Sequence, residues 1–584
     1  MKSVLYVIVA SLGFVLPRAA FSQIVGSYPT SVFAVDSVSA DQSVLSKKVD
    51  FALREILEQK YLGGTATGSS IAPIAEFPDS SHILAYVYPS RGSTIAQVVA
   101  KLNSLGLYPP VDTLVHVVTA GLPIDQATLL QLASDPRIGA IALVTPPHLN
   151  GHGTEGDAIM HGPAARGIAK GDKVTVGVLS DDCGSHAGEP TATDGLATSI
   201  SIVDDGHAGT RTHEGRAMMD IVHTLAPDAH LAFAQGVSSM KDMASNIRKL
   251  AAAPYYCKVI CDDITDFAEP FFEDDANVVT QAIHDVVKNN NVVYITSAGN
   301  WARDVHTDNF NFSASPVPLL NEDGTTTTNY TVHNFSGSNS NLFYVPAGAN
   351  YDIVLQWDEP YNGPTDHFKL LLYDMTKKKI INRSQGGGQA IQRIRDVNNG
   401  GGTYYGVFIA ADGTPPTPPL RFSLVTWSSN RLLPSAQKNG VSSILGHAMD
   451  TDVITCSAVS WRRVADGSPD ISTHENYQRE IYSSEGPSMI HGKDRGKPEL
   501  VAPDMVQTNV AGWGVFSGTS AAAPHVAAVA AMYLSKGKNF GKTATAVREA
   551  LIKGCRARGV PHQSSDAAKV GHGLSDALQT LQAP

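Results

Sequence analysis

The stretch that most limits the fold lies near the carboxyl end, where a polar loop runs into a helix of small residues. It reads Phe516-Ser-Gly-Thr-Ser-Ala-Ala-Ala-Pro-His-Val-Ala527. Gly518 permits a tight backbone approach, and Thr519 and Ser520 favour a helix start. The alanines that follow let the helix pack deep in a core. Backbone N–H groups at such a start favour negative charge, so Ser520 is either a catalytic nucleophile or the cap of an ordinary buried helix.

The same stretch resembles the nucleophile motif of the subtilisin-like serine peptidases, the subtilase family. Gly-Thr-Ser-x-Ala-Ala-Pro-His-Val-Ala is retained, and Ala521 stands where a methionine usually follows the serine. The resemblance implies an α/β fold with a parallel sheet in a three-layer core. It also implies a serine endopeptidase that acts on polypeptides, with Ser520 as the nucleophile and without a cofactor.

Other segments match the same family, in the family's order. They lie within residues 171–300 and 444–577, about half of the chain. They include the Ser-Ser-x-Gly-Pro loop at 482–487, the Lys-Pro-x-x-x-Ala-Pro strand at 497–503 and the closing Gly-x-Gly motif at 571–577.

Two candidate site residues follow predicted strands. Val174–Leu179 is a continuous apolar run, as in buried parallel strands, and Asp181 comes just after it. Ligands and chemistry gather at the carboxyl ends of such strands. The resemblance makes Asp181 the triad aspartate, and it makes Asn300, in a strand-Ala-Gly-Asn segment, an oxyanion donor. Without the resemblance, Asp181 would be an ordinary acidic turn.

The general base is where the sequence departs from the family. The usual His-Gly-Thr-His pattern is replaced by Thr-His213-Glu214-Gly215, and alignment on Gly215 puts Glu214 where the base should be. His213 lies one residue earlier, about 100° away around a helix. Three hypotheses compete: Glu214 as the base with an acidic pH optimum, as in the related sedolisins; His213 presented by an altered loop; or an inactive site. Sedolisins place an Asp one turn after the Glu, where this chain has Met218.

A second carboxylate is expected near the base. Residues 258–264 match the strand that forms the wall of the substrate cleft, and Asp263 falls near the family's serine position there. Paired carboxylates that cannot both ionise raise one pKa, which would help a glutamate hold or pass a proton. A solvated acidic turn is the alternative. Four further acidic residues are expected on the surface, with a calcium site as the alternative: Glu269, Glu273, Asp274 and Asp275.

The first 150 residues suggest a leader and an accessory unit. Residues 1–22 have the lysine, apolar run and small-x-small ending of a cleaved secretory signal, and neither this run nor any later one is long enough to span a membrane. We therefore expect an exported protein, extracellular or periplasmic. In residues 23–150, strands at 82–88, 111–120 and 138–144 alternate with helices at 93–105 and 123–134. This α+β unit of ferredoxin-like type resembles the family's inhibitory propeptide in its place in the chain, and a retained accessory domain is the alternative.

Composition limits the partners. The 584 residues are too many for one ordinary domain, and a content of 43% hydrophobic and 17% charged residues is normal for globular proteins. The net charge of −11, without any basic block, argues against nucleic acid as a partner. The chain has five cysteines, an odd number, so at least one cannot form a disulfide within the chain. Cys257 and Cys261 lack partners at metal-ligand spacing, so we predict no metal site there.

Residues 302–437 differ from their surroundings. Asn, Gly and Thr become frequent, and we interpret the segment as an all-β sandwich inserted between two parts of the catalytic domain, 151–301 and 438–584. A carbohydrate or protein ligand for the sandwich is one hypothesis, and an inert spacer is the other. The rival to a peptidase is a catalytically inactive subtilase-fold protein that binds through this sandwich. The predicted strands are Tyr351–Trp357, Phe368–Tyr373, Tyr404–Ala410 and Arg421–Trp427.

Overall fold

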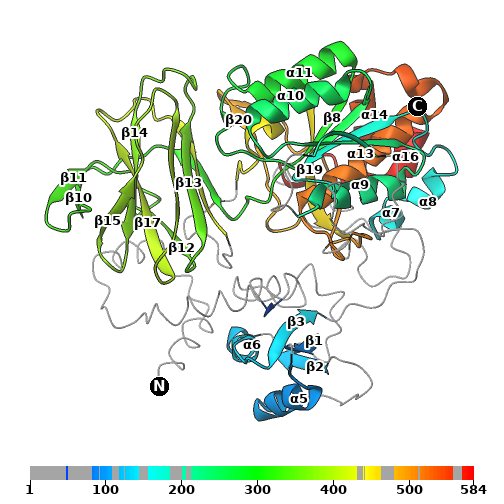
Figure 1. Cartoon of the computed structure of the whole chain (residues 1–584). Helices are drawn as coiled ribbons and strands as arrows, with labels where there is room; N and C mark the ends of the chain where they lie inside the picture. The colour runs from blue at the N-terminus through cyan, green and yellow to red at the C-terminus, as the bar shows by residue number, and fades with distance from the viewer. Residues whose placement is uncertain are drawn as a thin grey trace.

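The fold is taken from a computed structural model, in which three bodies are arranged as Figure 1 shows. The predicted signal peptide, residues 1–22, lies outside the described residues. No helix in the described part of the chain is both long and apolar enough to cross a membrane. The structure describes residues 48–49, 82–90, 92–107, 118–123, 125–143, 155–184, 200–205, 212–429, 439, 441–461, 479–510, 513–556 and 568–583.

The largest body is built on a parallel sheet of seven strands, with the order β22-β19-β8-β7-β4-β6-β5. Apart from the exposed edge strand β5, its strands are buried on both faces, as continuous apolar sequences such as Val174–Leu179 predicted. The carboxyl ends of β4, β7 and β8 carry the predicted site residues. The strands are β4 (Thr175–Ser180), β5 (Ser201–Asp204), β6 (His230–Gln235), β7 (Val259–Asp262), β8 (Val293–Ser297), β19 (Val453–Ser460) and β22 (Leu500–Asp504).

Helices cover both faces of this sheet and complete three layers. On one face, α9 (Glu214–Leu225) and α13 (Thr519–Ser535) share a core with Val176, Cys261 and Ile295. On the other, α10 (Met240–Ala251) and α11 (Val278–Asn290) pack against Leu179, Ile260 and Tyr294. The α/β three-layer fold is therefore confirmed. Shorter helices are α7 (Glu155–Ile159), α8 (Gly162–Ala165), η2 (Gly446–Met449), η4 (Gly537–Gly541), α14 (Ala544–Lys553) and α16 (Ala577–Gln582).

The smaller α+β body precedes the catalytic core. Its described strands form an antiparallel sheet with the order β2-β1-β3. The predicted helix start at residue 123 is wrong, because the strand continues to Pro123 and the side chain of Asp125 caps the helix by accepting from the Thr128 N–H (2.8 Å). Met505, after β22, packs into this body's core. The elements are β1 (His82–Pro89), α5 (Ile95–Ser104), β2 (Val118–Pro123), α6 (Gln126–Ala133) and β3 (Ile138–Leu143).

The inserted body is a sandwich of two antiparallel four-stranded sheets, β16-β13-β18-β9 and β12-β17-β14-β15. Aromatic and aliphatic side chains from both sheets fill the space between them. The hairpin of β10 (Val317–Leu320) and β11 (Thr327–Tyr330) lies beside the second sheet (Figure 1). The eight strands are β9 (Val305–Asn309), β12 (Asn341–Val345), β13 (Asn350–Trp357), β14 (Phe368–Asp374), β15 (Lys379–Arg383), β16 (Ile391–Val397), β17 (Thr403–Ala411) and β18 (Arg421–Ser428).

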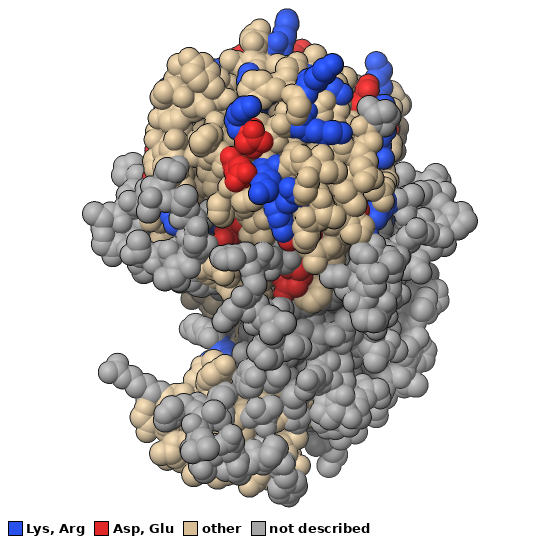
Figure 2. Space-filling model, turned by 90° about the vertical axis from the view of Figure 1, so that its right-hand side faces the viewer, with Lys and Arg blue, Asp and Glu red and all other residues tan. Residues whose placement is uncertain are grey.

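Charged side chains of both signs share the surface drawn in Figure 2, and the cysteines lie in or against the core of the largest body. On the face drawn in Figure 2, acidic and basic side chains are interspersed over the described surface. All five cysteines are free thiols, buried except for the partly buried Cys555. Burial raises the pKa of Cys257 and of Cys555 to about 12, so neither thiol is a reactive thiolate near neutral pH.

Candidate active site

Ser520 lies in the first turn of α13, where the backbone N–H groups have no partner within the helix. Its side chain is largely buried, with 7% of the residue exposed. The chain reaches it through Gly518, which has φ of 98° and whose N–H donates to the buried carboxylate of Asp504 (3.0 Å). A Cβ on Gly518 would lie 3.0 Å from Nδ2 of Asn300, so both the backbone angle and the space favour glycine.

Glu214 is the first residue of α9, and its side chain reaches Ser520. Its carboxyl is hydrogen-bonded to the Ser520 side chain and to the Asp263 side chain. Asp263 follows β7 directly and is also hydrogen-bonded to the buried hydroxyl of Ser180. Three elements thus bring a hydroxyl and two carboxyls into one hydrogen-bonded chain.

The surroundings of the two carboxyls favour a shared proton. Burial raises the pKa of Glu214, while its hydrogen bonds to Ser520 and Asp263 oppose that shift. Burial, followed by the negative charge of Glu214, raises the pKa of Asp263 well above its usual value. Because two carboxylates in contact cannot both ionise readily, one proton is retained by the pair well above the pH at which a free carboxyl loses it.

Asp181 holds the start of α9 and has no direct bond to Ser520 among the described residues. Its carboxylate accepts from the N–H and the hydroxyl of Thr212 (2.7 and 2.6 Å) and from the N–H of Glu214 (3.0 Å). A carboxylate at this end is favourable, because helix N-termini carry free N–H groups and a partial positive charge. Asp181 therefore fixes the backbone from which the Glu214 side chain projects.

His213 points elsewhere. It has φ of 63° at the N-cap of α9, and its Nδ1 lies 2.9 Å from a carboxylate oxygen of Asp182. Gly215 lets the helix start approach the sheet closely, since a Cβ there would lie 2.4 Å from the ring of Phe233. This close packing fixes the register in which Glu214 faces Ser520 and His213 faces Asp182.

Asn300 lies beside the helix start that carries Ser520. Its side-chain oxygen accepts from the N–H and the hydroxyl of Thr519 (both 3.1 Å), and the Thr519 hydroxyl accepts from the Gly299 N–H (3.1 Å). With the oxygen occupied in this way, Nδ2 is the end of the amide that faces Gly518. The amide orientation is set by these bonds, and it presents a donor near Ser520.

A family model described as the subtilase family of peptidases matches residues 196–573. The chain belongs to the subtilase family. It is accordingly a serine peptidase with polypeptide substrates. A comparison with curated proteins found no match.

Several solved proteases resemble this subtilase at low sequence identity. The CspB protease of Clostridium perfringens is 12% identical, with 73% of this chain and 96% of that chain covered and a TM-score of 0.47. MycP1 from the ESX-1 type VII secretion system is 13% identical, with 76% of this chain and 89% of that chain covered and a TM-score of 0.37. A lanthipeptide protease is 13% identical, with 73% of this chain and 92% of that chain covered and a TM-score of 0.36.

A buried charged cluster lies directly behind the site and was missed from the sequence. His447, in η2, faces Glu269 through Nδ1 (2.9 Å) and Asp262 through Nε2 (3.2 Å), and all three side chains are almost fully buried. Burial lowers the pKa of His447, but the two carboxylates outweigh it and raise that pKa well above its usual value. The expectation that Glu269 is surface charge is therefore wrong. A histidine after an apolar run was the available signal.

In the described part of the chain, two clusters of side chains have the composition of metal ligands, His306-Asp308-His333 and His284-Asp450-Asp452. In the first, the Asn311 N–H donates to Nδ1 of His333 (3.0 Å), which leaves the ring proton on Nε2, a buried nitrogen without a hydrogen-bond partner among the described residues. A protonated nitrogen cannot bind a metal. In the second, Nε2 of His284 lies 2.9 Å from Asp450, beside Asp452.

Proposed function

We propose that this chain is a secreted serine endopeptidase in which Glu214, rather than a histidine, is the general base for Ser520. The observation that carries the proposal is the Glu214 carboxyl, held between the Ser520 hydroxyl and the Asp263 carboxyl. In the reactive state, Glu214 is ionised and accepts the Ser520 proton, while Asp263 keeps its own proton and donates it toward Glu214. A donor behind the base holds its orientation, as the third member of a catalytic triad does.

The reaction then follows from these positions. Ser520 Oγ attacks the peptide carbonyl carbon as its proton passes to Glu214, and the protonated Glu214 gives that proton to the leaving amine. Nδ2 of Asn300 and the Ser520 N–H donate to the developing oxyanion. Loss of one such donor typically costs on the order of a hundredfold in rate. Water attacks the acyl-enzyme in the reverse roles, with Glu214 again as the base.

The arrangement supports an acidic working range and differs from sedolisins in the source of the second carboxyl. In sedolisins an Asp follows one helical turn after the Glu, but in this chain Met218 occupies that position and is fully buried in the core. Asp263 comes instead from the end of β7. Activity should rise as Glu214 ionises and fall when the pair loses its second proton, giving a bell-shaped profile with macroscopic pKa values of the pair.

The test is peptide hydrolysis against pH for the wild type and two matched variants. Glu214→Gln keeps a hydrogen-bonding amide but removes the base, and we expect kcat to fall by on the order of a thousandfold or more at every pH. His213→Ala should keep the wild-type pH profile. A Glu214→Gln enzyme that stays active, or a profile that rises through neutrality and is lost in His213→Ala, would refute the glutamate base.

Covalent labelling of Ser520 distinguishes an inactive site from an active site that was tested with an unsuitable peptide substrate. A fluorophosphonate probe should modify Ser520 in the wild type between acidic and neutral pH, and it should not modify Ser520→Ala. Secretion and removal of residues 23–150 as a propeptide also belong to this proposal. N-terminal sequencing of the protein recovered outside the cell tests both, and an intact chain retained in the cytoplasm would contradict them.

A further inference from the structure

The sandwich is attached to the segment that follows Asp263. The side chain of Gln356, on β13, is almost fully buried and donates to the carbonyls of Phe267 (3.1 Å) and Glu269 (2.7 Å), while its oxygen accepts from the Phe271 N–H (2.9 Å). The Tyr361 hydroxyl, from the loop after β13, donates to the Ala268 carbonyl (3.0 Å). This segment therefore has a fixed position relative to the sandwich.

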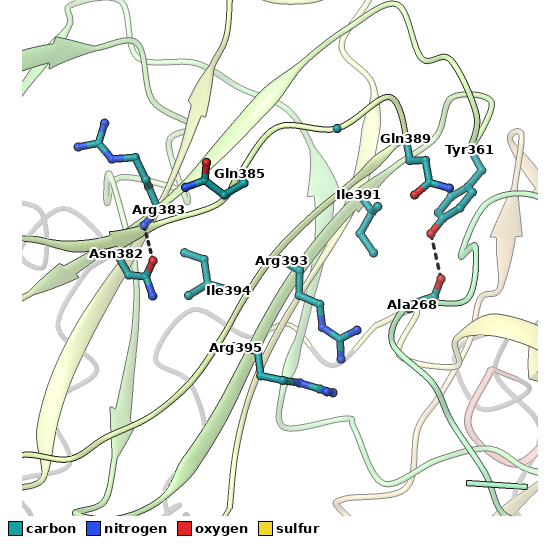
Figure 3. A pocket seen from close by; sticks show the side chains of 11 residues that line it. Ala268, Tyr361, Asn382, Arg383, Gln385, Gln389, Ile391, Arg393, Ile394 and Arg395 are labelled. Atoms are coloured by element: carbon teal, nitrogen blue, oxygen red, sulfur yellow. Dashed lines mark hydrogen bonds between the residues drawn. The ribbon is translucent and has the colours of Figure 1, made fainter. Parts of the chain in front are cut away.

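A cavity of about 490 Å³ opens at this junction (Figure 3). Ala268 and Tyr361 form one side, and the β15–β16 connection and strand β16 form the other. Ala268 is five residues after Asp263, and five residues of extended chain span at most about 18 Å. The Glu214 carboxyl and its two hydrogen bonds separate Ser520 from Asp263 by roughly a further 8 Å, so a polypeptide bound at Ser520 could reach the cavity with about eight residues on one side of the scissile bond.

The lining is polar and contains guanidinium groups. Arg393 and Arg395, two residues apart on β16, face the same side of the sheet, and both are ion-paired with the single carboxylate of Asp352 (2.5 and 2.8 Å). Asp352 is 3% exposed, whereas the Arg395 side chain is 67% exposed. Arg395 lines the cavity, and among the described residues its guanidinium donates through Nε and Nη2 to Asp352, which leaves Nη1 without a protein acceptor there. Because two guanidinium groups share one carboxylate, they have N–H donors left to bind a further carboxylate.

The backbone around the cavity suits an extended polypeptide. In the described part of the chain, β16 pairs only with β13 and is an edge strand of its sheet. Edge strands present free N–H and C=O groups to which a peptide can add as a further strand. Oligosaccharide recognition usually needs an open aromatic face, and the only ring in the lining is that of Tyr361, whose hydroxyl is already bonded to Ala268.

We propose that this cavity is a remote subsite of the peptidase, which binds an extended segment of the polypeptide substrate through an acidic side chain that meets Arg395. The inference rests on the proposed endopeptidase function. It assigns the inserted sandwich a part in substrate selection, at a distance from the scissile bond.

The test compares two fluorogenic peptides that are identical around the cleaved bond and carry an extension of about eight residues, rich in Glu in one and in Gln in the other. The wild type should cleave the Glu peptide with a kcat/KM about threefold to fivefold higher, mainly through KM. Arg395→Gln should remove this advantage. Lys369→Gln removes a cation of the other sheet that is also ion-paired, with Asp412 (2.7 Å), and it should keep the advantage.

Two outcomes would overturn the subsite: equal cleavage of both peptides by the wild type with extensions on either side, or an advantage that Arg395→Gln leaves intact. Binding by the full-length Ser520→Ala protein, measured by fluorescence anisotropy, is independent of turnover. Preference for the Glu peptide in that measurement supports the subsite even if no peptide is hydrolysed, in which case only the endopeptidase proposal fails. If the protein binds a neutral oligosaccharide at the cavity and does not bind the Glu peptide there, the cavity is a carbohydrate site and the proposal is refuted.

Discussion

At the scale of single residues, Asp263 carries a sharp prediction about the upper limb of the pH profile. Its pKa is raised well above the usual value, so it stays protonated through the acidic range and ionises only as the pH rises. Asp263→Asn still donates a hydrogen bond to Glu214 but has no proton to lose. We expect this variant to keep activity within about tenfold at acidic pH and to lose the descending limb in kcat/KM measured against pH.

Ser180 provides the matched variant, because its hydroxyl bonds to Asp263 and lowers the pKa of that carboxyl. Ser180→Ala removes this stabilisation of the ionised form, so the pKa of Asp263 should rise and the descending limb should move to higher pH. A limb that stays in place in both variants would show that another group controls it.

At the scale of helices and strands, the cluster around His447 carries a stability prediction. Removing one partner of a buried ion pair typically costs about 3–5 kcal/mol, since the other charge is left unpaired. His447→Gln should therefore lower the free energy of unfolding, measured with urea, by an amount near the low end of that range. His491→Gln, which removes a histidine whose side chain is 56% exposed and which pairs with Asp358, should cost less than about 1 kcal/mol.

The direction of the pKa shift of His447 determines how the stability cost of His447→Gln changes with pH. Because the folded-state pKa of His447 is raised, its contribution is complete below the unfolded value of 6.5 and is lost as the pH rises through the folded value. The cost of His447→Gln should therefore be largest in acid and decline with rising pH. A cost that is independent of pH would mean that His447 is neutral in the folded protein.

This cluster also shows where sequence reasoning stops. Strand β4 and helix α13 were predicted from local patterns, since an apolar run and a glycine-serine helix start are local signals, whereas helix α9 was expected from the family resemblance. Glu269 meets the His447 side chain across 178 residues of chain, with the whole sandwich between them in the sequence. No rule based on sequence spacing applies to residues so far apart in the chain. Glu269, an acidic residue in a polar stretch, was therefore assigned to the surface. The second carboxyl at Asp263 was suggested only because the family resemblance aligned the two strand ends.

At the scale of the whole molecule, the buried amide of Gln356 links the sandwich to the catalytic body. Gln356→Ala would leave two carbonyls and one N–H of residues 267–271 without their partner, at a cost of about 1–3 kcal/mol for each buried group. The segment that begins at Asp263 should then move more freely. Since small displacements of a catalytic group reduce rates steeply, we expect kcat to fall on the order of tenfold, with faster hydrogen exchange in residues 263–273.

Asn398→Ala is the control that separates coupling from general loss of stability. Its side-chain amide is also buried and donates to three carbonyls, those of Val345, Pro346 and Gly401, all within the sandwich. Both variants should lower the unfolding midpoint of the sandwich, but only Gln356→Ala should reduce kcat. Equal reductions in kcat would mean that the sandwich supports the active site through its stability alone. An unchanged kcat in Gln356→Ala would mean that the segment after Asp263 is held by the catalytic body itself.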